Sequence, residues 1–203
     1  MMRGCVCRWC GEAVTEADER YEAMDGTAVH AECMEALLLE TVGVEALAER
    51  YGLSPDQVFV GVGSDDVLAM CFMTFFNSNR PILFPDITYS FYDVWAEEFR
   101  IPYKQIPLDR NFTICPEDYA GENGGIVFPN PNAPTGKLLP LEDVERIIAQ
   151  NPDVIVIVDE AYIDFGGTSA LPLIDKYDNV LVVQTFSKSR SMAGMRIGYA
   201  MAQ

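Results

Sequence analysis

Hydrophobic and polar positions follow two alternating patterns between residues 42 and 203. Continuous apolar runs alternate with stretches in which apolar residues recur every three or four positions. The runs predict buried strands, and the wider spacing predicts amphipathic helices. The expected strands lie at 57–63, 80–86, 102–108, 124–130, 153–162, 179–189 and 196–202. The expected helices lie at 42–52, 64–76, 88–99 and 141–150, with Ser64 as the N-cap of the second and Thr88 near the start of the third.

The alternation of strands and helices indicates the fold class. Strands joined through helices form βαβ units, which predict an α/β fold with a mostly parallel sheet. The run at 153–162 is apolar at successive positions, as in a strand that is covered on both faces. Ligands of such sheets bind just beyond the carboxyl ends of the strands. Four segments should therefore share one edge of the sheet: 63–65, 130–136, 159–162 and 185–188.

Composition and charge limit the classes of protein that fit this chain. Of its 203 residues, 49% are hydrophobic and 22% are charged, as in ordinary globular proteins. The formal net charge of −17 repels phosphate backbones, which argues against nucleic-acid binding as the main activity. The most apolar run, Val67–Phe76, is much shorter than the roughly 20 residues of a membrane span. Since the N-terminus also lacks the apolar stretch of a secretory signal, we expect a cytoplasmic protein that does not enter membranes.

The residues available for catalysis direct attention to a lysine. His30 is the only histidine, so Ser-His-Asp and Cys-His mechanisms are excluded unless His30 itself is the base. Lys188 directly follows the apolar run 179–186, where a buried ammonium group would be costly. One interpretation is a loop lysine that reaches solvent. The other is a lysine with a lowered pKa that can bond a carbonyl compound.

The residues around Lys188 favour a bound phosphate. Positions 179–203 contain no Asp or Glu, although the chain as a whole is strongly acidic. Arg190 and Arg196 lie in this stretch among several hydroxyl side chains, and guanidinium groups with hydroxyls suit phosphate. The turn at 61–65 opens a helix, and the amides of a helix N-terminus attract anions.

Three further side chains at the expected edge each allow two interpretations. Asp159 ends an apolar strand, where it could cap a helix or pair with an arginine, or could face a protonated heterocyclic nitrogen. Tyr162 lies three residues further on, on the same face of a helical turn, and could bond a ring oxygen. Tyr89 and Tyr92 could be core aromatics, or one of them could stack on a planar ring.

Five motifs in order, GVGSDD, PDITYSFY, FPNPNAPTG, VDEAYIDF and TFSKSRSMAGMRIGYA, carry a family resemblance. Together they resemble the fold-type I pyridoxal-phosphate (PLP) aminotransferases of class I/II, most closely the histidinol-phosphate aminotransferases. The resemblance covers residues 42–203 and implies the large domain of these enzymes, a three-layer sandwich around the sheet. It also implies PLP as the cofactor.

The resemblance implies roles for individual residues. Lys188 resembles the lysine that bonds the cofactor and moves the substrate proton, and Asp159 resembles the carboxylate that keeps the pyridine nitrogen protonated. Tyr162 resembles the phenol that bonds the ring oxygen, and Tyr89 the aromatic that stacks on the ring. The residues that resemble the phosphate site are Ser64, Asp65, Thr185, Ser187 and Arg196.

One position departs from the family pattern. The asparagine that usually stands before Pro-Thr-Gly is replaced by Ala133, so Asn132 or Asn130 is expected to supply the amide. We take Asn132 as the expected cofactor residue.

The resemblance implies a transaminase that moves an amino group between histidinol phosphate, or a related amine or amino acid, and 2-oxoglutarate. The resemblance also implies an obligate homodimer, so self-association is expected. The family's C-terminal small domain has no counterpart here, which leaves two other readings of the scaffold open: a PLP-binding chain without turnover, and a zinc-bearing interaction module. Decarboxylation of an amino-acid phosphate is the chemical alternative.

The first 41 residues form a separate Cys-rich head, which we expect to be a domain distinct from 42–203. Cys7 and Cys10, and then His30 and Cys33, stand in two pairs with two residues between the members, a spacing typical of tetrahedral zinc. The pattern resembles zinc knuckles and LIM-like or treble-clef modules, and predicts one structural zinc and a hairpin that turns at 25–26. The alternatives are free thiols with a surface histidine, or Cys5 as a substitute ligand.

Overall fold

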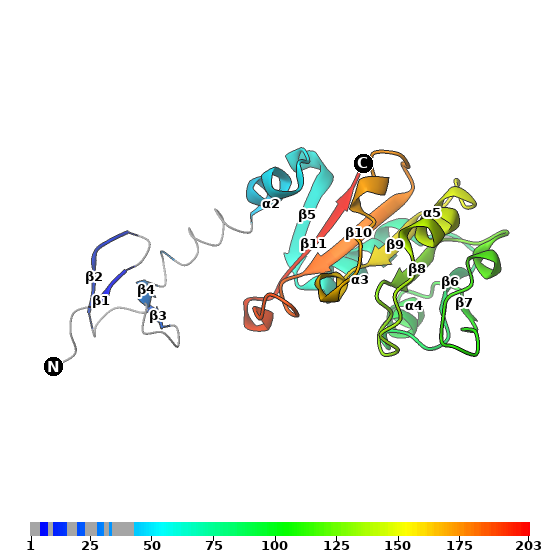
Figure 1. Cartoon of the computed structure of the whole chain (residues 1–203), viewed down its shortest axis with the longest axis horizontal. Coiled ribbons are helices and arrows are strands. Elements are labelled where there is room, and N and C mark those ends of the chain that lie inside the picture. Colours follow the sequence, from blue (N-terminus) through cyan, green and yellow to red (C-terminus); the bar gives the residue numbers. More distant parts are fainter. Residues whose placement is uncertain (1–4, 8–9, 16–19, 23–27, 31–32, 34–42) are drawn as a thin grey trace. The chain divides into compact units, whose positions relative to one another are not determined.

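The computed structural model describes residues 5–7, 10–15, 20–22, 28–30, 33 and 43–203 (Figure 1). The chain divides into two compact units, residues 1–56 and 57–203, each of which is described by itself. This boundary lies after the helix α2 (Val44–Tyr51), whereas the sequence pattern predicts a domain boundary between residues 41 and 42. No helix in the described segments is both long and apolar enough to cross a bilayer.

The second unit is built on one seven-stranded sheet. Its strands are β5 (Val58–Val62), β6 (Ile82–Pro85), β7 (Tyr103–Ile106), β8 (Ile126–Pro129), β9 (Val156–Asp159), β10 (Val180–Thr185) and β11 (Ile197–Ala202). They lie in the order β5-β11-β10-β9-β8-β6-β7 (Figure 1). The five strands from β10 to β7 pair in parallel, and β11 is antiparallel to both neighbours. The predicted α/β class with a mostly parallel sheet is therefore confirmed.

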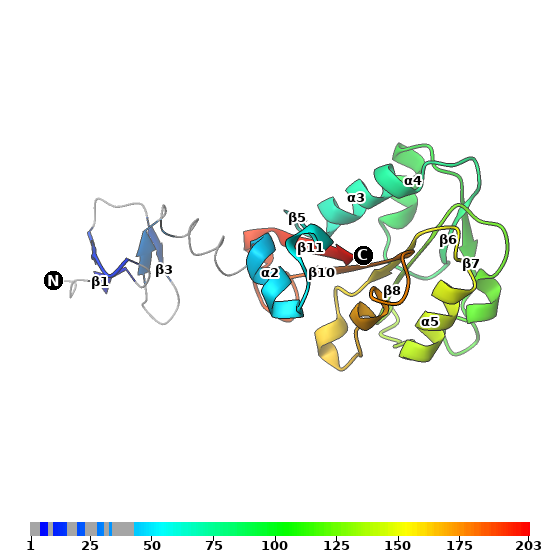
Figure 2. The same cartoon turned by 90° about the horizontal axis from the view of Figure 1, so that it is seen from above.

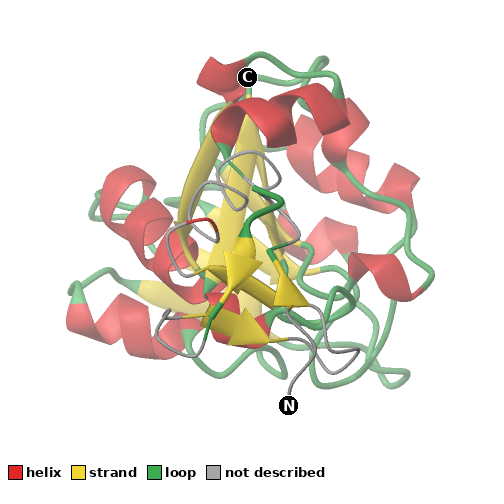
Figure 3. Ribbon diagram, turned by 90° about the vertical axis from the view of Figure 1, so that its left-hand side faces the viewer, coloured by secondary structure: helices red, strands yellow, loops and turns green. Residues whose placement is uncertain are grey.

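Helices cover both faces of this sheet. The helices are α3 (Ser64–Phe75), α4 (Tyr92–Glu98) and α5 (Leu141–Ala149). Figure 2 shows α3 and α4 on one side of the strands and α5 on the other, and Figure 3 shows helices in red around the yellow strands. The three-layer arrangement follows because β8, β9 and β10 are buried at every position and need cover on both faces.

Two helix starts differ from the expected positions. Gly63, with φ +89°, precedes the first helical residue of α3, so Ser64 is not the N-cap. No side chain caps this end, which leaves the first amides of α3 facing outward. The helix expected from Thr88 begins only at Tyr92, and the preceding Tyr89 lies in a turn instead.

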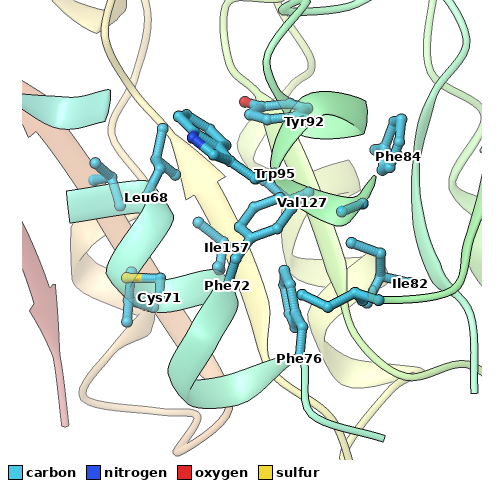
Figure 4. Packing of buried hydrophobic residues seen from close by; sticks show 14 of the residues in the cluster. Leu68, Cys71, Phe72, Phe76, Ile82, Phe84, Tyr92, Trp95, Val127 and Ile157 are labelled. Carbon is cyan, nitrogen blue, oxygen red and sulfur yellow. The ribbon is translucent and has the colours of Figure 1, made fainter. Parts of the chain in front are cut away.

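An aromatic cluster holds α3 and α4 against the sheet (Figure 4). The Phe72 ring is the centre: its centroid lies 5.0 Å from that of Phe76 and 5.5 Å from that of Trp95, both edge to face. Tyr92 stacks on Phe72 at 6.1 Å and is fully buried. Such packing joins the C-terminal half of α3 to α4 and fixes the ring of Tyr92, whose hydroxyl matters for the site below.

Among its described residues, the first unit contains two short antiparallel ribbons besides α2. Strands β1 (Cys5–Val6) and β2 (Ala13–Val14) form one ribbon, and β3 (Arg20–Glu22) and β4 (Ala28–His30) form the other. In the second ribbon Arg20 is opposite His30, which matches the expected hairpin. Its expected turn at 25–26 lies outside the described residues.

Candidate active site

One cavity of about 190 Å³ collects most of the predicted cofactor residues. It lies at the carboxyl ends of the parallel strands β8 and β9, where Pro129 and Asp159 are the last strand residues. The predicted residues that line it are Ser64, Asp65, Tyr89, Asp159, Tyr162, Ser187, Lys188 and Arg196. They come from five separate stretches of chain, which the order of the strands brings to one edge of the sheet.

The start of α3 and Arg196 form the end of the cavity that suits an anion. A Cβ atom on Gly63 would lie 2.6 Å from Nη2 of Arg196, so the guanidinium lies directly against this turn, whose φ of +89° favours glycine. A Cβ atom on Gly198 would lie 2.2 Å from the amide nitrogen of Ser64, so β11 lies directly against the start of the helix. Outward-facing amides, a helix dipole and a guanidinium together attract a phosphate.

Asp159 is a buried carboxylate at the opposite end. Its Oδ2 accepts a hydrogen bond from the Tyr92 hydroxyl at 2.8 Å, and its Oδ1 accepts one from the amide of Ala161 at 3.1 Å. Burial raises the pKa of Asp159 to about 6, although both hydrogen bonds and Lys188 favour the charged form. At neutral pH the group is therefore mainly a carboxylate, ready to face a cation.

Lys188 stands at the mouth of the cavity, and its side chain is exposed rather than buried. Its Nζ lies 5.2 Å from the centroid of the Tyr162 ring, which is a cation–π distance. The Tyr89 hydroxyl donates to Oδ1 of Asp65 at 2.8 Å. Burial first, and then this hydrogen bond, raise the pKa of Tyr89, so the phenol stays protonated.

Two predicted residues lie behind the cavity wall. Nδ2 of Asn132 donates to the carbonyl of Ile87 at 2.9 Å and to Oγ1 of Thr135 at 3.0 Å, and its Oδ1 accepts from the Thr88 hydroxyl at 3.2 Å, so its amide joins its own loop to the segment after β6. Ala133 lines the cavity instead. Thr185 is buried, and its Oγ1 accepts a hydrogen bond from the amide of Ser187 at 3.1 Å, so it holds the backbone of a residue that lines the cavity.

Sequence reasoning missed the partner of Asp159. Tyr92 was considered only as a core aromatic or a stacking ring, and its hydroxyl in fact bonds the carboxylate. The tyrosine is 67 residues away in the chain, and no local pattern marks such a pair.

The four predicted zinc ligands meet in the first unit. The ligand atoms of Cys7, Cys10, His30 and Cys33 all lie within 4.8 Å of one another. Nδ1 of His30 is 3.5 Å from Sγ of Cys10 and 3.8 Å from Sγ of Cys33. Removal from water, and then the neighbouring thiols of Cys10 and Cys7, raise the pKa of Cys33 to about 12. The side chain of Cys5, the alternative ligand, lies outside the described residues.

The sequence matches the family described as aminotransferase class I and II over residues 39–203. The chain belongs to this family. It is 58% identical over 156 residues to the histidinol-phosphate aminotransferase of Lactococcus lactis subsp. cremoris strain SK11, and the alignment covers 77% of this chain and 44% of that protein. The chain thus spans less than half the length of this relative.

Solved structures agree with this membership. A histidinol-phosphate aminotransferase from Sinorhizobium meliloti in complex with pyridoxal-5′-phosphate matches with a TM-score of 0.71 and 25% identity, over 78% of this chain and 46% of that one. A decarboxylase from Sulfurospirillum multivorans matches with a TM-score of 0.70 and 23% identity, over 84% of this chain and 54% of that one. The second likeness concerns the fold alone.

Proposed function

We propose that this chain carries the PLP site of an aminotransferase that acts on histidinol phosphate or a related amine, with a 2-oxo acid as amino acceptor. One observation carries the proposal: Asp159 and Lys188 line the same cavity as the anion-attracting start of α3 with Arg196. Relatives with this chemistry, at 58% identity in the matched region, support the substrate class.

The cavity fits the cofactor group by group. Ser64, Ser187 and Arg196 would hold the phosphate, because amides, a hydroxyl and a guanidinium meet at that end. Asp159 would face the pyridine nitrogen, and Tyr89 offers an aromatic ring beside it. Ala133 leaves space on the wall where the family has an amide side chain. We therefore assign the remaining polar contact to Tyr162 and not to Asn132.

PLP, when bound, supplies an electron-withdrawing ring that stabilises negative charge on the substrate carbon. The side chains of this protein would hold the cofactor, keep its ring nitrogen protonated and move the substrate proton. The Asp159 carboxylate, kept charged by Tyr92, would hold a proton on the facing ring nitrogen. Nζ of Lys188 would bond the cofactor and, when released from it, take up and return the substrate proton. Tyr162, beside Lys188, would orient that amine.

Direct assays separate this function from its alternatives. The purified chain would be mixed with PLP, 2-oxoglutarate and either histidinol phosphate or a phosphorylated amino acid, and glutamate and carbon dioxide would be measured. Glutamate formed from histidinol phosphate supports the proposal. Carbon dioxide without glutamate would favour a decarboxylase, and PLP binding without either product would favour a chain that holds the cofactor without turnover.

Asp159 predicts a pH dependence of PLP binding. The charged form is needed to face the ring nitrogen, and with a pKa of about 6 this form is lost as the pH falls below 6. PLP affinity should therefore fall by up to about tenfold for each pH unit below 6, since one proton is taken up. Fluorescence titration with PLP between pH 5 and 8 measures this effect.

Asp159→Asn provides the matched control, because the amide keeps the shape and removes the titrating group. The variant should bind PLP more weakly at pH 7.5 and should lose the acid-side dependence that comes from Asp159. Unchanged affinity and an unchanged profile would leave Asp159 with only a structural role.

We also infer that the chain self-associates, as expected for this family. Three apolar side chains between residues 87 and 94 are exposed: Ile87 at 39%, Phe91 at 46% and Val94 at 47%. They flank Tyr89 in the same segment of chain, so an association here would lie close to the cavity. Sedimentation velocity at micromolar concentration should give a dimer, and Phe91→Asp should shift it to monomer. A monomeric parent chain would contradict this inference.

In the first unit we propose one structural zinc held by Cys7, Cys10, His30 and Cys33. Three sulfur atoms and one imidazole nitrogen within 4.8 Å match the tetrahedral donor set that zinc prefers. Four protein ligands leave no open position, so the ion would support the fold of the unit and would not catalyse a reaction.

A further inference from the structure

Backbone hydrogen bonds shape the loop that carries Lys188, including one from the amide of Ser191 to the carbonyl of Lys188 at 3.0 Å. The loop joins β10 to β11, and at its base the amide of Phe186 donates to the carbonyl of Ile197 at 3.0 Å. The amide of Met192 donates to the carbonyl of Phe186 at 3.0 Å. Between these points Ser191 adopts φ +54°, a left-handed turn. In the described part of the chain, the backbone hydrogen bonds of residues 187–192 stay within the loop and its base, so side chains attach this part of the loop to the other elements of the unit.

Arg190 is the side chain that ties this middle part to the rest of the unit. Its Nη1 donates to the Tyr199 hydroxyl on β11 at 2.6 Å. Its Nε lies 3.6 Å from Oδ2 of Asp164, in the turn Ile163–Phe165. Its guanidinium carbon lies 4.7 Å from the centre of the Phe186 ring. Only 20% of the Arg190 side chain is exposed, whereas 42% of the Asp164 side chain is, so the contacts with Tyr199 and Phe186 are better shielded from water than the ion pair.

The anchor behind Arg190 is a buried chain of hydrogen bonds. The Tyr199 hydroxyl donates to Oε1 of Gln184 at 2.8 Å, and Nε2 of Gln184 donates to Oε2 of Glu160 at 2.8 Å. Glu160 also accepts from the hydroxyl of Ser169 and from the amide of Ala170. Tyr199, Gln184 and Glu160 are exposed by 0%, 4% and 1%. A satisfied network of this kind is rigid, and it begins next to Asp159.

The second group that holds the loop is the carboxylate of Asp164. Asp164, which Arg190 approaches, also accepts a hydrogen bond from the hydroxyl of Ser189. Two consecutive loop residues after Lys188 therefore bind one carboxylate. That carboxylate lies two residues after Tyr162, whose ring faces Nζ of Lys188. The contacts of Ser189 and Arg190 with Asp164 therefore lie close to the Lys188–Tyr162 pair.

We propose that Arg190 is a positioning residue that sets Lys188 relative to Tyr162 and Asp159, by holding the loop to Tyr199 and Asp164 at the same time. The proposal rests on the function assigned to Lys188 above. Arginine suits the task because its planar fork presents several donors in different directions. Lysine at this position could reach only one of the two partners well.

The first test uses the protein without cofactor. In Arg190→Gln, hydrogen exchange of the amides at 187–192 should become at least about tenfold faster, because a charge-assisted hydrogen bond is lost. Arg146→Gln is the matched control: Arg146 pairs with Glu117 and Asp143 on the surface, away from the cavity. Its exchange in 187–192 should stay at the parent rate. Unchanged exchange in Arg190→Gln would overturn the proposal, whatever the chain does with PLP.

The second test asks whether Arg190 acts through Lys188. Arg190→Gln should weaken PLP binding about tenfold in the parent chain, because only the correctly placed loop is competent to bind. In a Lys188→Ala background most of this loss should disappear. An equal loss in both backgrounds would mean a general disturbance of the site and would overturn the proposal.

Two further variants guard against a folding defect. Asp164→Asn keeps the Tyr199 contact and should give a smaller effect of the same kind, and Arg190→Lys should restore part of the affinity. Melting temperatures would be measured for each variant. If the parent chain bound no PLP, the proposed function would fail while the exchange experiment still decided the role of Arg190 in the loop.

Discussion

Lys188→Ala is expected to abolish covalent attachment of PLP and to lower amino transfer by at least about 10³-fold, since the nucleophile and the proton-moving base are lost together. No other lysine is found among the described residues that line the cavity. The side chain is exposed, so its truncation should leave the melting temperature nearly unchanged. The measurements are the visible absorbance of the PLP complex and the intact mass after borohydride reduction.

Lys176→Ala is the matched control for this substitution. Lys176 is also exposed and pairs with Glu145 on the surface, so its removal should keep the absorbance, the trapped mass and the turnover. Non-covalent PLP binding should persist in Lys188→Ala, because the phosphate end of the cavity is untouched. If Lys188→Ala still gained the mass of reduced PLP as the parent chain does, the role assigned to Lys188 would be contradicted.

The elements of the fold could be predicted from the sequence because burial on both faces leaves a strong local signal. Strands β8, β9 and β10 are apolar runs of four to six residues, buried throughout. The order of the strands could not be predicted in this way. β5 pairs with β11, which is more than 130 residues later, and no property of either strand alone names its neighbour.

The same limit explains the misplaced helix start. Serine before acidic residues is the usual signal of an N-cap, and it favoured Ser64. In the structure the cap is Gly63, which adopts φ +89° and lies against the guanidinium of Arg196, a residue from the far end of the chain. A local rule cannot include that contact.

The candidate site was predictable to the extent that it follows from strand ends. Asp159 and Lys188 were expected at one edge, and the structure brings both to the cavity. The hydrogen bonds that orient them were not predictable. Tyr92 to Asp159 and Gln184 to Glu160 connect residues that are 67 and 24 positions apart. Asn132 is a further example: its residue type suited the cofactor, but hydrogen bonds to Ile87 and Thr88, 45 and 44 positions away, occupy its amide together with Thr135.

Cys10→Ser is expected to lower the zinc affinity of the first unit by about a hundredfold or more. Structural zinc in small modules binds with roughly 10–16 kcal/mol, so the loss of one thiolate among four ligands removes several kcal/mol. The Sγ atom of Cys10 lies 3.5 Å from Nδ1 of His30 and within 4.8 Å of the other ligand atoms, and an alcohol is a poor replacement at that point. Zinc per chain would be measured by elemental analysis after dialysis against a weak chelator.

Cys5→Ser and Cys115→Ser distinguish a built site from nonspecific thiol binding. With Cys7, Cys10, His30 and Cys33 as the ligands, as we propose, both variants should keep one zinc per chain. Because the metal would hold the two ribbons of the first unit together, Cys10→Ser should also speed hydrogen exchange at residues 28–30, while β9 and β10 exchange as in the parent. The same experiment decides the remaining ligand question: loss of zinc in Cys5→Ser but not in Cys10→Ser would make Cys5 the ligand, and a parent chain without stoichiometric zinc would leave the four residues as free thiols beside a histidine.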